Sequence, residues 1–208
     1  MNIFTDWFHG TPSTIAQWTL TGRGALKGSA PLHKGLFFTT NRVFALGSAL
    51  GSAGGSEASP NVYQATLKPG ARVLDISAPG VTCTPQESEH LRQLVVSRRP
   101  GKGNIQAEYL EYWVNGWRTG EIMKYAVRPG DLQMEQLARL ALNQRETADG
   151  QRAWNLLQRI TRDCIEDIVD ASIAAGYQAV AGNERQDGVT YPILIVLDPN
   201  ILTSPVKV

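Results

Sequence analysis

Near its C-terminus the chain reads Ile193-Leu194-Ile195-Val196-Leu197-Asp198-Pro199-Asn200. The first five residues of this stretch form a continuous apolar run, which is typical of a strand that is buried on both faces of a sheet. The last three are turn-forming residues, so the strand should end there. The stretch therefore predicts a buried central strand near the end of the fold.

Other strands are predicted at both ends of the chain, and helices between them. The strand-like segments cover residues 6–9, 35–39, 62–67, 72–76 and 177–181. Lys68-Pro69-Gly70 has turn chemistry, so residues 62–67 and 72–76 are expected to form a hairpin or to be neighbouring strands.

Helical patterns fill most of the middle of the chain. A short helix is expected over 14–18, and longer ones over 42–50, 84–97, 104–127, from a cap at Asp131 onward, and over 150–175. Asn41 is expected to cap the helix that follows it, and Gly176 to end the last one. Cys164 falls on the apolar stripe of that last helix and is expected in the core.

Strands at both ends with a helical block between them indicate an α+β fold rather than an alternating α/β fold. The 208 residues, 42% of them hydrophobic, can bury one substantial core. We therefore expect a single domain over residues 1–208, with residues 84–175 as a helical insertion within it.

Composition narrows the classes of function. The net charge of +1 gives no electrostatic case for nucleic-acid binding. Two cysteines, Cys83 and Cys164, and three scattered histidines show no metal-ligand spacing, so no metal site is predicted. The N-terminus lacks signal-peptide regions, and no segment approaches the roughly 18 apolar residues of a membrane span. A cytoplasmic protein is expected, and delivery into a host or target cell stays open.

Two motifs in the first fifth of the chain could bind a ligand. His9-Gly10-Thr11 lies at the end of the first strand; His9 offers two ring nitrogens, and Gly10 lets the backbone approach a ligand without a Cβ. By itself this motif is also typical of a turn with a surface histidine. In Gly35-Leu36-Phe37-Phe38-Thr39 the two phenylalanines point to opposite faces of a strand, so at most one of them lines a cleft.

A third motif lies near the C-terminus. Gly176-Tyr177-Gln178-Ala179-Val180 reads as a short strand, and Glu184 and Asp187 follow it in a polar stretch. A polar stretch of this kind is as typical of a solvated loop as of a catalytic site.

In this order, the three motifs and the closing strand resemble the mono-ADP-ribosyltransferase fold of the His-Tyr-Glu branch, especially its small phage and bacterial-toxin members. The resemblance covers the two ends of the chain and leaves the helical block unmatched. It implies an ADP-ribosyltransferase-like split β-sheet core that uses NAD as a substrate. Nicotinamide would be released, and ADP-ribose would pass to a macromolecular target, either protein, DNA or RNA. For a toxin, an antitoxin or immunity protein is an expected partner.

The resemblance also implies roles for single residues. His9 would hold a ribose hydroxyl, and the Gly10 backbone, within the His9-Gly10-Thr11 motif, would hold the nicotinamide carboxamide. Phe37 stands where the family has tyrosine, so it could stack on nicotinamide but offers no hydroxyl. Phe38 would belong to the core.

Glu184 would be the carboxylate that stabilises the oxocarbenium-like transition state, with Asp187 as the alternative acid. In polymerase-type members this glutamate starts the last strand directly, and here Tyr191-Pro192 occupies that stretch. Two hypotheses follow: an NAD-dependent ADP-ribosyltransferase, or a catalytically degenerate module of the same fold that binds ADP-ribose, nucleic acid or a protein partner.

Overall fold

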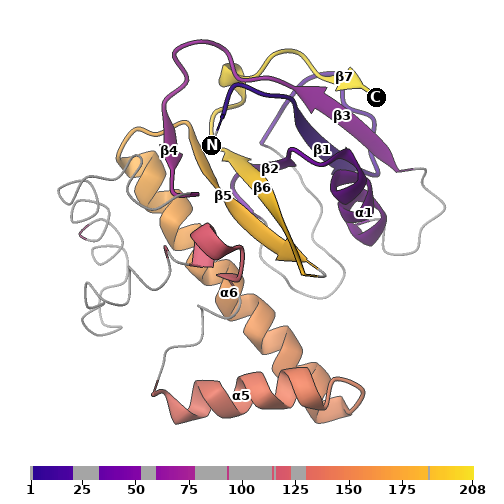
Figure 1. The fold of residues 1–208 in the computed structure, drawn as a ribbon, viewed down its shortest axis with the longest axis vertical. Helices are drawn as coiled ribbons and strands as arrows, with labels where there is room; N and C mark the ends of the chain where they lie inside the picture. Colours follow the sequence, from indigo (N-terminus) through magenta and orange to yellow (C-terminus); the bar gives the residue numbers. More distant parts are fainter. Residues whose placement is uncertain are drawn as a thin grey trace.

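A mixed β-sheet organises the molecule. The computed structural model describes residues 2–20, 33–52, 60–77, 93, 114, 116–122, 130–186 and 188–208. Within these ranges a seven-stranded sheet has the order β4-β5-β6-β2-β1-β3-β7 (Figure 1). Its strands are β1 (Trp7–Thr11), β2 (Leu36–Thr39), β3 (Asn61–Ala65), β4 (Val73–Asp75), β5 (Ala179–Gln186), β6 (Val189–Val196) and β7 (Val206–Lys207). β4 and β5 run parallel, and the other neighbouring strands run antiparallel.

The helices are α1 (Arg42–Ser52), α5 (Leu132–Asn143), α6 (Ala148–Ala174) and the short 3-10 helix η1 (Pro199–Ile201). Together with the sheet they confirm the α+β class. Of the helices expected over 84–97 and 104–127, the structure describes only residues 93, 114 and 116–122, of which 93, 114, 116–119 and 122 are helical. Cys83 lies outside them as well. In the described part of the chain, no helix combines the length and the apolar character needed to cross a membrane.

The closing strand is central, as its apolar run predicts. β6 lies between β5 and β2, and residues 193–196 expose 3% of their surface or less. The turn after it is also confirmed, because Asp198 caps η1 by accepting a hydrogen bond from the Asn200 N–H at 3.0 Å. That backbone hydrogen bond holds the pKa of Asp198 below its usual value.

The predicted helix ends are confirmed by their capping bonds. The side chains of Asn41 and Asp131 accept hydrogen bonds from the N–H groups of Phe44 (2.9 Å) and Met134 (3.1 Å). Gly176 ends α6 with a φ of 77°, a left-handed conformation that favours glycine. α5 packs on the N-terminal part of α6, away from the sheet (Figure 1).

Two expectations about strands are wrong. β3 and β4 are neither a hairpin nor neighbours, because β3 pairs with β1 and β7 while β4 lies at the opposite edge of the sheet beside β5. After β3 the chain turns away: the Lys68 N–H donates to the Ile201 carbonyl, and the Arg72 carbonyl accepts from the Gln178 N–H. Pairing with distant segments therefore overrides the local turn signal.

The second wrong expectation concerns the stretch that carries Glu184. It is not a loop, because β5 continues to Gln186 and pairs with β6 along its whole length. The short helix expected over 14–18 is absent as well. There the Ile15 N–H donates to the Tyr63 hydroxyl and the Trp18 indole N–H to the Thr203 carbonyl, so tertiary contacts replace helical ones.

The two faces of the sheet bury different clusters. One face, which we call the helix face, carries Phe37, Val180 and Ile195 in one cross-strand row and packs against α6. The opposite face carries Trp7, Phe38 and other buried residues of β1, β2, β3, β5 and β6. Cys164 is 5% exposed within the α6 cluster, which confirms its predicted place in the core.

Candidate functional site

The ladder between β1 and β2 is interrupted where the first two motifs meet. Phe8 and Thr39 are the one register pair that joins these strands, whereas five pairs join β1 to β3 and four join β2 to β6. Continuing the register would place Gly10 opposite Phe37, but no ladder pair forms there. Instead the Phe37 carbonyl accepts a hydrogen bond of 2.6 Å from His9 Nδ1. An imidazole thus replaces a backbone amide at the centre of the sheet.

His9 is buried in an aromatic cluster on the face opposite the Phe37 side chain. It is 4% exposed, and its ring lies 5.3 Å from that of Phe38 and 5.9 Å from that of Trp18, centroid to centroid. Nδ1 must carry the proton of this bond, because a carbonyl oxygen only accepts. Phe38 is 2% exposed, which confirms that it belongs to the core.

Gly10 and Thr11 have structural partners of their own. A Cβ at Gly10 would lie 1.7 Å from the Ala45 carbonyl oxygen, so α1 packs directly on the glycine from the helix face. This contact already requires glycine, whether or not a ligand approaches. The Thr11 hydroxyl accepts a hydrogen bond from the Ser13 N–H at 3.2 Å and stabilises the turn after β1.

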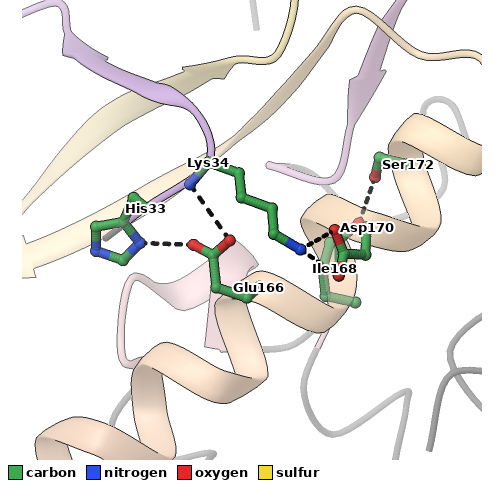
Figure 2. Close-up of polar contacts among 6 residues, drawn as sticks. All are labelled: His33, Lys34, Glu166, Ile168, Asp170 and Ser172. Atoms are coloured by element: carbon green, nitrogen blue, oxygen red, sulfur yellow. Dashed lines mark hydrogen bonds and ion pairs between the residues drawn. The ribbon is translucent and has the colours of Figure 1, made fainter. Parts of the chain in front are cut away.

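Phe37 lies beside a polar cluster that sequence reasoning did not identify. Its ring is half-buried against the α6 cluster, and the His33 ring lies 4.4 Å away, tilted by 51°. His33 Nδ1 lies 2.8 Å from Glu166 Oε1. Lys34 Nζ lies 2.6 Å and 2.7 Å from the two carboxylate oxygens of Asp170 (Figure 2).

This cluster joins residues far apart in the chain. Glu166 and Asp170 are four residues apart, so they lie on one face of α6, and they contact two consecutive residues, His33 and Lys34, that come just before β2. The spacing of the two acids was a signal in the sequence. No sequence pattern indicated that their partners would be His33 and Lys34, more than 130 residues earlier.

Glu184 lies on the helix face, but not next to Phe37. It is the cross-strand partner of Tyr191 and comes four residues after Val180, which shares a row with Phe37. At the usual rise per residue, this separates Glu184 from the Phe37 row by roughly 13 Å along the strand. Asp187, the alternative acid, lies outside the described residues.

Glu184 lies beside aromatic side chains and is partly shielded from water. Burial raises the pKa of its carboxyl above the ordinary 4.5. Tyr191 stacks on Phe44 of α1, with ring centroids 4.6 Å apart and planes 9° apart. Such a site suits a carboxylate whose charge is not fully hydrated.

No carboxylate begins the apolar run of β6. Ile193 stands there, 3% exposed, in a row with Thr39 and Gly182. The two residues just before this run, Tyr191 and Pro192, carry no carboxylate either; they pair with Glu184 and Asn183 of β5.

No family model, curated protein or solved structure matches this chain. In the described ranges, no group of three or more His, Cys, Asp or Glu side chains is arranged to hold a metal ion. What the site can do thus depends on the junction of β1 and β2, the polar cluster beside Phe37, and Glu184.

Proposed function

We propose that this protein is an NAD-dependent mono-ADP-ribosyltransferase that transfers ADP-ribose to a macromolecular target and releases nicotinamide. The supporting observation is the interrupted ladder between β1 and β2, at the place where Gly10 would otherwise pair with Phe37. His9 holds the Phe37 carbonyl at this break, and a planar amide such as the nicotinamide carboxamide can bind main-chain groups that lack a ladder partner. Phe37 supplies an aromatic ring beside it.

In this proposal His9 acts from the other face of the sheet. Its Nδ1 holds the Phe37 carbonyl and so fixes the strand that carries Phe37, while its ring is buried beside Trp18.

Glu184 is the proposed catalytic carboxylate. A carboxylate stabilises the positive charge that grows on the ribose as its bond to nicotinamide breaks, and it does so more strongly where water is scarce. The raised pKa of Glu184 reflects such partial desolvation. Tyr191 and Phe44 lie beside it as further aromatic surface.

A second candidate function is a non-catalytic module of the same fold that binds ADP-ribose, nucleic acid or a protein partner. It is favoured by the separation of Glu184 from the Phe37 row and by Tyr191-Pro192, which stands just before the apolar run of β6 in place of a carboxylate. In a transferase, the Glu184 side chain and the bound NAD would have to bridge the roughly 13 Å along the strand that separates Glu184 from the Phe37 row, whereas a binding module needs no carboxylate at the ribose.

Incubation with radiolabelled NAD and cell lysate tests both candidates. The transferase proposal predicts label on a macromolecule and release of nicotinamide, with both lowered about 100-fold or more in Glu184→Gln. Exposed Glu146→Gln is the matched control and should behave as wild type. NAD binding by calorimetry without nicotinamide release would contradict the transferase and support the binding module.

A further inference from the structure

A histidine–carboxylate pair lies beside the ring on which nicotinamide would stack. The side chains of His33 and Glu166 are 23% and 16% exposed, so the pair is largely but not completely shielded from water. His33 contacts the Phe37 ring. Glu166 projects from α6 toward His33 and holds its Nδ1 (Figure 2). The backbone N–H of Lys34 also points to Glu166, at 3.4 Å from Oε2, and helps to fix the carboxylate.

The hydrogen bond to Glu166 decides which imidazole nitrogen can accept a proton. An ionised carboxylate only accepts, so Nδ1 of His33 carries the hydrogen. In the neutral ring the lone pair then lies on Nε2, which makes no hydrogen bond within the part of the chain that the structure describes. A histidine that is oriented through Nδ1 and free at Nε2 has the arrangement of a general base.

We propose that His33 is the general base of the transfer reaction and that Glu166 is its positioning residue; this inference rests on the proposed function. The acceptor O–H gives its proton to His33 Nε2 while its oxygen bonds to the ribose C1′. The bond between C1′ and the nicotinamide nitrogen breaks, its electron pair leaves with neutral nicotinamide, and His33 later passes the proton to water. No oxidant or reductant is needed.

The neighbouring pair on the same two elements provides a control. Lys34 Nζ and Asp170 join the segment just before β2 to α6, as His33 and Glu166 do, but this pair has no ring to act as a base beside Phe37. Lys34→Met removes this ion pair and leaves His33 and Glu166 in place. If the cluster only attaches α6 to the sheet, removing either pair should change the rate of nicotinamide release by the same factor.

The experiment measures NAD hydrolysis, in which water is the acceptor, and NAD binding by calorimetry. His33→Ala should bind NAD with a Kd within about threefold of wild type, but release nicotinamide about 100-fold more slowly at saturating NAD. Added imidazole should restore part of the rate, because the deleted ring leaves a space of its own shape beside Phe37. Glu166→Gln should lose rate as well, and Lys34→Met should keep the wild-type rate.

Three outcomes would overturn the assignment of the base. His33→Ala could keep its rate within about threefold of wild type, lose it no more than Lys34→Met does, or lose it without any rescue by imidazole. Melting curves of all variants separate loss of the base from loss of the fold. A wild-type protein that neither binds nor cleaves NAD would instead overturn the proposed function, and the base with it.

Discussion

At the scale of single residues, the burial of Glu184 is the clearest electrostatic feature. Its pKa is raised by desolvation, so the folded protein holds this proton more tightly than the unfolded chain does. Between pH 4.5 and the raised value, the free energy of unfolding therefore falls as the pH rises. At pH values above the raised pKa, the buried carboxylate is ionised and lowers the free energy of unfolding by its full amount.

We expect Glu184→Gln to remove this cost. The variant should gain stability relative to wild type as the pH rises above 4.5, and the gain should vanish at lower pH, where both side chains are neutral. Thermal unfolding followed by circular dichroism at pH 4 and pH 7.5 measures the difference. Glu146→Gln at an exposed position is the control. If wild type and Glu184→Gln unfold at the same temperature at both pH values, the burial of Glu184 is contradicted.

At the scale of elements, α1 is fixed on the sheet by a backbone contact rather than by large side chains. The Ala45 carbonyl and the Ala49 amide approach Gly10, where a Cβ would lie 1.7 Å and 3.1 Å from their oxygen and nitrogen. Ala45 and Ala49 are themselves 2% exposed or less, which lets the helix come this close. The small residues of α1 therefore set its distance from β1.

Gly10→Ala tests this contact. The added methyl group meets a helix backbone that cannot rotate away, so we expect a loss of about 3 kcal/mol or more in the free energy of unfolding. Gly47→Ala in the same helix is the matched control, because its Cβ meets nothing within 4 Å. That change should stabilise the protein by up to about 1 kcal/mol through helix propensity. Equal effects in urea unfolding would contradict the packing described for Gly10.

At the scale of the whole molecule, the sheet and the α5–α6 pair differ in how they are buried. β6 lies between two strands and between two apolar clusters. α5 buries Ala141 alone among its residues and packs on α6 through a small separate cluster. Leu132 and Leu142 of α5 remain 71% and 63% exposed. Local stability should therefore decrease from the sheet toward α5.

Hydrogen exchange followed by mass spectrometry measures this gradient. Amides of α5 should exchange through local opening, at lower free energy than those of β6, whose exchange requires global unfolding. The C-terminal half of α6, which packs on the sheet, should resemble β6 rather than α5. Protection of α5 equal to that of β6 would show that the two parts unfold as one unit.

Several features could be predicted because they depend on neighbours in the sequence. The apolar run from Ile193 predicts a buried strand, and Asn41, Asp131 and Gly176 mark helix ends through their own side chains or backbone freedom. The candidate site was predicted only in part. His9 and Phe37 do meet, but through a side chain-to-carbonyl bond that no sequence pattern describes.

The sequence by itself determined the α+β class, the central strand and the helix ends at Asn41, Asp131 and Gly176, because local periodicity and capping require only nearby residues. Tertiary structure alone decided that β3 and β4 lie at opposite edges, that β5 extends through polar residues to Gln186, and that Glu184 lies away from Phe37. It alone joined His33 to Glu166 across 133 residues. Strand pairing and helix docking join distant segments, and such contacts leave no period in the sequence.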